Sequence, residues 1–215
     1  MIERTVEYLA ETFSLPVFRT RDPGGTTISD AIRAVLLDAR NHGIDPMVEL
    51  LLYLAFRRQL TQEVIEPTLA SGTTVICDRY YDSTWVYQGF TKIGTYMGHQ
   101  DGLVTIRNLN LINETAAAGI QPDLTLWFDV PVEIGLARAH KRAEKLPEGQ
   151  REDRFEQKKL DFHQKVRDGY GRRYIEEQGR IVRIDARGTL DEVWGLVRSE
   201  LDRFFSKRGK GDGED

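Results

Sequence analysis

The sequence predicts one α/β domain in which a parallel β-sheet is flanked by helices on both faces. Short apolar runs alternate with longer segments of helical periodicity, which is the pattern of strands joined by helical crossovers. The 215 residues suffice for one core, and we expect a single domain over residues 1–205. Residues 206–215 are charged and rich in glycine, and we expect them to form a flexible tail.

The elements follow in chain order from these local patterns. Residues 1–13 are predicted to be helical because Ile2, Val6, Leu9 and Phe13 fall on one face. The four predicted strands are residues 15–20, 73–78, 124–130 and 181–186. The further predicted helices are residues 29–40, 46–66, 82–88, 103–118, 132–145, 154–178 and 190–205.

Some boundaries depend on proline and glycine. Asp45 is a good N-cap and Pro46 suits the first helical position, so a long helix is expected to begin there. Pro67 is expected to end that helix. Residues 90–102 contain glycines among small polar residues and are predicted to form a loop.

Composition makes several classes of function poor candidates. The chain has 30 Lys and Arg against 34 Asp and Glu, a formal net charge of −4, whereas nucleic-acid binding needs a broad basic surface. The longest apolar stretch, residues 47–56, is too short to span a bilayer and contains Glu49. Cys77 is the single cysteine, so no internal disulfide can form, and we expect a cytoplasmic protein.

Charged residues at the ends of predicted strands are candidates for phosphate chemistry. Residues 21–26 read Arg-Asp-Pro-Gly-Gly-Thr, where paired glycines allow close backbone approach and Arg21 can bind a phosphate. Asp78 and Arg79 follow an apolar strand, and their side chains suit magnesium and phosphate respectively. The alternatives are a surface turn for the first group and a structural ion pair for the second.

Tyr53 and Arg57 lie one turn apart on the same face of a predicted helix. An aromatic ring beside a guanidinium is a natural clamp for a planar base. Four leucines surround Tyr53 in the sequence, so this residue is also a strong candidate for the hydrophobic core.

A polar group lies near the start of the next predicted helix, and it consists of Ser83, Thr84, Tyr87 and Gln88. Hydroxyl and amide groups of this kind can contact the edge of a base and a sugar. Taken alone, an ordinary polar helix start explains the same residues.

A basic group surrounds a predicted lid loop of about residues 143–154. Its members are Arg138, Arg142, Arg151 and Arg154. Arginines on a closing loop neutralise charge during phosphoryl transfer. A solvated charged surface is the alternative interpretation.

Taken in order, these motifs resemble the thymidylate kinase family over residues 1–205. The order is Arg-Asp-Pro-Gly-Gly-Thr, a tyrosine four residues before an arginine, Asp-Arg-Tyr, Tyr-Gln-Gly, Pro-Asp-Leu-Thr-Leu, and a basic loop that ends in Asp-Arg-Phe-Glu. Adenylate and UMP/CMP kinases are similar in fold but carry different acceptor-site motifs. The resemblance implies a P-loop-kinase-like fold and transfer of the ATP γ-phosphoryl to dTMP, with Mg²⁺, giving dTDP for dTTP synthesis.

The resemblance also implies a role for each candidate residue. Tyr53 takes the position of an aromatic residue that stacks on thymine, and Arg57 that of an arginine that bonds the thymine carbonyl. Arg79 is expected to hold the acceptor phosphate, and Asp78 to lie near magnesium. Ser83 and Thr84 are expected to contact the base edge, Tyr87 the deoxyribose, and Gln88 the substrate. Arg21 is expected to lie near the phosphates, and Arg138 and Arg142 near ATP. The lid arginines Arg151 and Arg154 are expected to contact the transferred phosphoryl group.

One family motif does not occur in these residues. The family has a strand followed by a phosphate-binding loop of the G-x-x-x-x-G-K-[S/T] type, whereas the only Gly-Lys pair here is Gly209-Lys210. We expect the first, central strand of the sheet to be missing as well. The chain as written is therefore expected to be poorly stable and nearly inactive, through either a late start or a real loss of the ATP site.

Other functions are kept open. A non-catalytic relative could bind dTMP or form dimers after losing the ATP site. A kinase of another nucleoside monophosphate would show no thymine selectivity that depends on Arg57. Members of the family are commonly homodimers, and we expect a homodimer here, with the apolar helix from Pro46 as a candidate surface.

Overall fold

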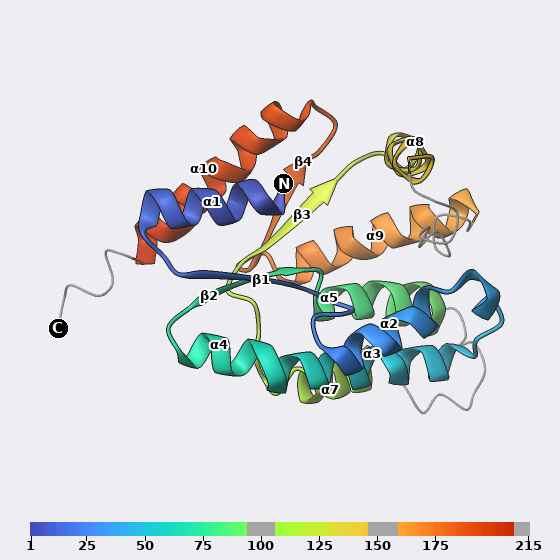
Figure 1. Ribbon diagram of the computed structural model, residues 1–215. Helices are drawn as coiled ribbons and strands as arrows, with labels where there is room; N and C mark the ends of the chain where they lie inside the picture. Colours follow the sequence, from blue (N-terminus) through green and yellow to red (C-terminus); the bar gives the residue numbers. More distant parts are fainter. Residues whose placement is uncertain (94–105, 146–158, 209–215) are drawn as a thin grey trace.

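A computed structural model describes residues 1–93, 106–145 and 159–208. It is a helix-rich α/β fold that contains two small parallel sheets (Figure 1). The strands are β1 (Val17–Arg21), β2 (Thr74–Asp78), β3 (Thr125–Asp129) and β4 (Ile181–Asp185). Each strand overlaps the segment predicted for it, so the four predicted strands are confirmed.

The helices follow the predicted order along the chain. The α-helices are α1 (Ile2–Phe13), α2 (Thr27–Leu37), α3 (Pro46–Leu60), α4 (Glu66–Ala70), α5 (Tyr81–Thr84), α7 (Ile106–Ala116), α8 (Val132–Ala143), α9 (Leu160–Glu176) and α10 (Leu190–Arg208). The remaining helical segments are the 3₁₀ turn η1 (Ala39–Asn41) and the π-helical η2 (Thr61–Ile65) and η3 (Trp85–Ile93). The predicted alternation of strands and helices is therefore confirmed.

The strands pair in two parallel ladders, β1 with β2 and β3 with β4. Arg21 lies opposite Asp78 at the end of the first ladder, and Asp129 lies opposite Asp185 at the end of the second. Within the described residues, the two ladders are not hydrogen-bonded to each other. The parallel arrangement is as predicted, but the described strands do not form one continuous sheet.

The first and last helices pack side by side over both ladders (Figure 1). Leu9 of α1 and Val197 of α10 belong to one buried cluster together with Ile184 of β4. Ile76 of β2 and Leu126 of β3 pack against the same cluster. One apolar core thus joins the two ladders, although no backbone hydrogen bond does so among the described residues.

A second group of helices lies on the other side of the ladders, around α3 (Figure 1). Phe56 of α3 packs with Leu36 of α2, and Leu50 of α3 packs with Leu109 of α7. All four side chains are almost completely buried. These helices carry several of the predicted acceptor-site residues, so the site is supported by a well-packed core.

The long helix from Pro46 does not end at Pro67 as predicted. Pro67 lies in the first turn of α4, where a missing N–H costs little. The π-helical turn η2 directly precedes that position and connects α3 to α4. The helical path therefore continues to Ala70, because the proline falls where a new helical turn begins.

Residues 90–93, the first part of the predicted loop over residues 90–102, are helical instead, because η3 continues to Ile93. Gly89 within η3 allows close approach of α7, since a Cβ atom there would lie 2.3 Å from Leu109 Cδ2. The glycine thus serves packing and does not end the helix. Residues 94–105 and 146–158, which include the rest of this loop and most of the predicted lid, lie outside the described residues.

The last helix, α10, extends to Arg208 and so passes the predicted end at residue 205. Residues 206–208, which were predicted to belong to the tail, are therefore helical, and residues 209–215 lie outside the described part of the chain. None of the helices that the structure describes combines the length and apolar character needed to cross a membrane.

Candidate functional site

The ends of β1 and β2 bring three predicted phosphate-site residues to one edge. Arg21 and Asp78 are register partners at the end of the ladder, and Arg79 follows directly. The backbone N–H of Asp22 donates to the Asp78 carbonyl at 2.9 Å, which extends the link between the two strands. Arg21, Asp78 and Arg79 are all exposed, so this edge is accessible to a phosphate group.

Arg79 has a backbone conformation that residues other than glycine rarely adopt. Its φ is 65°, in the left-handed region, and strain of this kind clusters at binding sites. Its guanidinium carbon lies 5.4 Å from the centre of the Tyr87 ring, an attractive cation–π arrangement. Arg21 is engaged differently, because its Nη2 donates to Asp30 Oδ1 at 3.2 Å.

The loop after β1 depends on Gly25. Its φ is +91°, and a Cβ atom there would lie 2.5 Å from Thr20 Oγ1 and 2.8 Å from Leu60 Cδ1. Directly after it, Thr26 caps α2 by accepting a hydrogen bond from the Ser29 N–H at 3.1 Å. The paired-glycine motif is therefore a tight loop between the strand end and a helix N-terminus.

Arg57 is the centre of a buried polar cluster. Its Nε and Nη2 donate to the two carboxylate oxygens of Asp22 at 2.7 and 2.9 Å. Its Nη1 donates to Thr84 Oγ1 at 2.8 Å and to Asn113 Oδ1 at 2.7 Å. One guanidinium thus ties together the loop after β1 and the helices α3, α5 and α7.

The Arg57 side chain is completely buried and carries its charge beside a buried carboxylate. Burial by itself would lower the pKa of Arg57, but the charge of Asp22 and its hydrogen bonds outweigh burial and raise the pKa. Two guanidinium nitrogens are used by the bidentate pair, which is the strongest form of this interaction. The cluster is therefore charged and rigid before any ligand arrives.

Tyr53 lies in the core of the helical layer. Its side chain is 8% exposed and packs with Leu36 and Phe56, and its ring centre lies 5.4 Å from that of Phe56. The core interpretation left open by the sequence thus describes its surroundings. Stacking of Tyr53 on a base stays a prediction.

The helix α5 and its continuation η3 carry the other predicted acceptor residues. The hydroxyls of Ser83 and Tyr170 are 2.9 Å apart, and Thr84 accepts from Arg57 as described. The Tyr87 ring lies close to both Arg79 and Tyr170, with the two tyrosine ring centres 6.4 Å apart. The structure therefore brings Ser83 and Tyr87 together against one residue of α9.

Gln88 is buried on the face of η3 that looks toward α3. Its Nε2 donates to Glu49 Oε1 at 2.7 Å, and both side chains are at most 1% exposed. The Gln88 Oε1 atom is buried without a hydrogen-bond partner among the described residues. Such an acceptor is costly in a protein interior, which is a reason to keep Gln88 among the substrate-contact predictions.

The structure describes only two of the four arginines that were predicted to lie near ATP and in the lid, Arg138 and Arg142. Arg138 of α8 donates from Nη1 to the Ala186 carbonyl at 2.6 Å, and from Nη2 to the Arg187 carbonyl at 2.9 Å. Its guanidinium thus fastens the loop that follows β4. Arg142 is exposed near the end of α8. The lid arginines, Arg151 and Arg154, lie outside the described residues.

Sequence reasoning missed several residues that hold this site together. Asp22 was part of a quoted motif, but its distance of 35 residues from Arg57 hid their pairing. The other missed members are Glu49, Asp82, Asn113, Tyr170, Arg173 and Arg180. A polar residue within an apolar helix stretch, such as Glu49, was the one signal that the sequence offered.

Comparison with known proteins decides the family. The family model described as thymidylate kinase matches residues 1–195. The chain belongs to the thymidylate kinase family. Curated relatives named thymidylate kinase are similar over most of the chain. The one from Geotalea daltonii is 43% identical over 187 residues, 87% of this chain and 82% of the relative.

Two other members of the thymidylate kinase family show similar identity and coverage. The relative from Trichlorobacter lovleyi is 48% identical over 170 residues, which are 79% of this chain and 75% of the relative. The relative from Desulfovibrio desulfuricans is 40% identical over 210 residues, 98% of this chain and 92% of the relative. The resemblance inferred from motif order is therefore confirmed at the level of the family.

The family implies a magnesium ion, and the residues at the strand edge fit one. In the described residues no group of three or more metal-binding side chains occurs. A single exposed carboxylate at Asp78, beside two arginines, suits a magnesium ion that is held mostly by substrate phosphates and water. Magnesium binding at Asp78 stays a prediction.

A groove in the described part of the chain lies away from these residues. It has a volume of about 570 Å³ and lies between α9 and the β3–β4 ladder. Its lining residues are Trp127, Asp129, Arg167, Asp168, Gly171, Arg172, Ile175, Glu176 and Arg183. None of the predicted site residues lines this groove, so it does not mark the acceptor site.

Proposed function

We propose that the protein is a thymidylate kinase that transfers the γ-phosphoryl group of ATP to dTMP. The observation that carries this proposal is the arrangement around Arg57 and the strand edge. A buried, rigid guanidinium cluster stands next to an exposed edge that presents Arg21, Asp78 and Arg79. This combination suits a ligand with a planar polar base at one end and a phosphate at the other.

The chemistry of such a reaction makes modest demands on the protein. The acceptor is already a phosphate oxyanion, so no general base is needed, and catalysis consists of positioning and neutralisation of charge. We assign the acceptor phosphate to Arg79 and magnesium to Asp78. When bound, the magnesium ion would neutralise charge on the phosphates. Arg151 and Arg154 would supply further positive charge from the lid.

The donor side of the reaction needs a part that these residues lack. The pattern G-x-x-x-x-G-K-[S/T] does not occur in the sequence, and this loop grips the ATP phosphates in related kinases. We infer that a further strand, placed between β2 and β3 and followed by such a loop, completes the active enzyme. The separate β1–β2 and β3–β4 ladders support this inference, because they share one core without pairing.

The inference has a measurable consequence for the 215 residues expressed alone. We expect their kcat to be at least about 10³-fold below that of the form that carries the loop, since comparable charge-stabilising parts contribute that much. We also expect marginal stability, because strand edges within the core would lack hydrogen-bond partners. Normal turnover with a cooperative unfolding transition would contradict both expectations.

A second candidate is a non-catalytic relative that binds dTMP and not ATP. This candidate requires an acceptor site alone, and the cluster around Arg57 has all its partners in place. Binding of dTMP without binding of ATP by the full-length natural protein would support this candidate against the kinase.

We also propose that the protein acts as a cytoplasmic homodimer through one face of the helical layer. Exposed apolar side chains occur on each of the helices α2, α3 and α7, and they are Ile28, Val35, Met47, Val48, Leu51 and Leu111. Where such side chains adjoin on a surface, they are candidates for an interface. Replacing Leu51 by Glu should turn the dimer into a monomer in analytical ultracentrifugation, whereas an unchanged dimer would contradict this surface.

The experiment that tests the kinase proposal is a comparison of acceptors with the full-length protein. Initial rates are measured with Mg²⁺-ATP and with dTMP, dUMP, CMP or AMP, and calorimetry gives the affinity for each acceptor. We expect dTMP to have the highest kcat/KM and the tightest binding. A higher kcat/KM for CMP or AMP would assign the protein to another acceptor class.

A further inference from the structure

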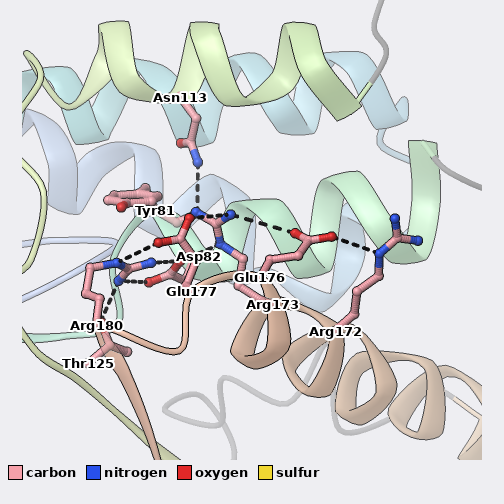
Figure 2. Close-up of polar contacts among 9 residues, drawn as sticks. All are labelled: Tyr81, Asp82, Asn113, Thr125, Arg172, Arg173, Glu176, Glu177 and Arg180. Atoms are coloured by element: carbon pink, nitrogen blue, oxygen red, sulfur yellow. Dashed lines mark hydrogen bonds and ion pairs between the residues drawn. The ribbon is translucent and has the colours of Figure 1, made fainter.

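A second buried charged cluster lies beside the acceptor residues and has no role in the function proposed so far. Its centre is Asp82 of α5, and Figure 2 shows how two arginines converge on this carboxylate. Arg180 donates to both oxygens of Asp82 at 2.8 Å. Arg173 of α9 donates from Nε to Asp82 Oδ1 at 2.9 Å. Asp82 thus joins α5 to α9 and to the turn before β4.

The cluster is balanced in charge and shielded from water. The side chains of Asp82 and Arg173 are each 7% exposed, and that of Arg180 is 11% exposed. Glu177 supplies a second negative charge, 3.1 Å from Arg173 Nη1 and 3.4 Å from Arg180 Nε. Two carboxylates therefore face two guanidinium groups, so neither arginine is left as an uncompensated buried charge.

Aromatic rings complete the enclosure. The guanidinium carbon of Arg180 lies 5.3 Å from the centre of the Tyr81 ring, and that of Arg173 lies 5.9 Å from it. Arg173 is also 5.5 Å from the centre of the Trp85 ring. Arg180 Nη1 donates further to Thr125 Oγ1 at the start of β3, at 2.8 Å. The cluster therefore has little freedom to move.

Three consecutive residues of α5 each contact different partners. Asp82 binds the two arginines, Ser83 contacts the Tyr170 hydroxyl, and Thr84 accepts a hydrogen bond from Arg57. α5 is the first turn of a helical segment that continues into η3. The side chains of Asp82, Ser83 and Thr84 attach this turn to its neighbours on both sides, and these contacts hold it in place.

From this geometry we propose that Asp82, Arg173 and Arg180 are positioning residues for the dTMP end of the active site. They fix α5 from the α9 side, so that Ser83 and Thr84 meet the acceptor in the correct place. This inference rests on the proposed kinase function. It assigns the three residues no contact with substrate and no part in the ATP site.

Loss of the Asp82 charge should change the KM for dTMP and not the KM for ATP. When Asp82 is replaced by Asn, the side chain keeps its shape but loses the charge that holds both arginines. We expect the KM for dTMP to rise roughly tenfold, because small displacements of positioning groups are costly, while the KM for ATP stays unchanged. Loss of general stability would instead lower the amount of active enzyme and leave both KM values alone.

A matched control is available on the same helix. Arg172 of α9 forms an exposed ion pair with Glu176 at 3.0 Å and does not touch Asp82 (Figure 2). Arg172→Ala should leave both KM values at the wild-type level. Arg180→Lys removes the bidentate contact with less disturbance, and it replaces Asp82→Asn in the test if that variant does not fold.

The test uses steady-state kinetics of the full-length protein, and the wild type is measured first. A wild type that does not phosphorylate dTMP overturns the proposed function. An active wild type whose folded Asp82→Asn or Arg180→Lys variant keeps its KM for dTMP overturns the positioning role. Equal rises in the KM for dTMP and for ATP overturn it as well. A selective rise for dTMP, absent in Arg172→Ala, supports it.

Discussion

The two sides of the proposed acceptor site differ in how far their side chains are already held by hydrogen bonds. Around Arg57, the hydrogen-bond partners Asp22, Thr84 and Asn113 are all in place and the guanidinium is completely buried. At the strand edge, Arg79 and Asp78 are exposed to solvent. The side around Arg57 is thus buried and fixed by side-chain hydrogen bonds. The strand edge is exposed, and the backbone of the strand end sets the positions of its residues.

Under the proposed function, this difference matches what each side would bind. A base is neutral and planar, and it is selected by donors and acceptors whose positions are fixed in advance. A phosphate is highly charged and keeps water and magnesium around it, so its ligands must stay accessible. We therefore expect substitutions on the buried side to affect folding and those at the edge to affect catalysis.

The largest effect on stability is expected for Arg57→Met. Removal of the guanidinium leaves Asp22 buried without its partner, which should lower the free energy of unfolding by about 3–5 kcal/mol. Urea denaturation followed by circular dichroism measures this change. Arg58→Met is the control, because this neighbouring arginine is exposed. A loss below about 1 kcal/mol for Arg57→Met would mean that the cluster contributes little.

A substitution at the strand edge should lower activity and leave stability almost unchanged. Arg79→Ala is expected to reduce kcat by about 10²–10³-fold, as removal of one charge-stabilising donor does in other enzymes. Its stability should stay near wild type, because the side chain is exposed and alanine carries the same backbone strain at this position. Initial-rate kinetics and thermal unfolding test this pair of expectations. Arg203→Ala, on the exposed surface of α10, should change neither.

A smaller effect is expected in the loop that joins the two sides. Gly25→Ala places a Cβ atom 2.5 Å from Thr20 Oγ1 in a left-handed conformation, which should cost about 1–3 kcal/mol of stability. Gly179→Ala serves as the control, because no atom lies within 4 Å of a Cβ at that position. Equal stability of the two variants would show that the loop adapts to the added methyl group.

The pH dependence should be the smallest effect near neutrality. Burial alone would raise the pKa of Asp82, but Arg180 and Arg173 outweigh burial and lower it. The hydrogen bond from Arg167, with help from Arg183, lowers the pKa of Asp129. A lowered pKa in the folded state gives stability that is present above the unfolded value of about 3.9 and lost as the pH falls below it.

Urea denaturation at a series of pH values tests this contribution. We expect it to be constant from about pH 8 to pH 5 and to decline below about pH 4. The Asp82→Asn variant should show a shallower decline in acid than the wild type, because one of the two carboxylates no longer titrates. Identical acid slopes for the two proteins would contradict the ionised Asp82 cluster.

Local patterns in the sequence were enough to predict the order of the elements. The charged residues that the sequence places at the ends of strands include Arg21 and Asp78, and the register pairs these two at one edge. The end of the helix from Pro46 could not be predicted, because the effect of Pro67 depends on the π-helical turn before it. Which strands pair with one another depends on contacts between residues far apart in the sequence, and local patterns do not indicate them.

The buried clusters were the part of the site that sequence could not reveal. Asp82 meets Arg173 and Arg180 across separations of 91 and 98 residues, and Asn113 meets Arg57 across 56 residues. A charged residue with a buried partner looks like a surface residue in the sequence. Tyr53 shows the converse limit, since helical periodicity is the same for a core residue and for a residue that faces a ligand.

The most direct test of the two-sided site uses ligands with and without the phosphate. Calorimetry compares thymidine and dTMP binding to the full-length wild type and to the Arg79→Ala variant. We predict that the variant binds thymidine as the wild type does, while its affinity for dTMP falls toward that for thymidine. Equal weakening of both ligands by Arg79→Ala would contradict the division into a buried base side and an exposed phosphate side.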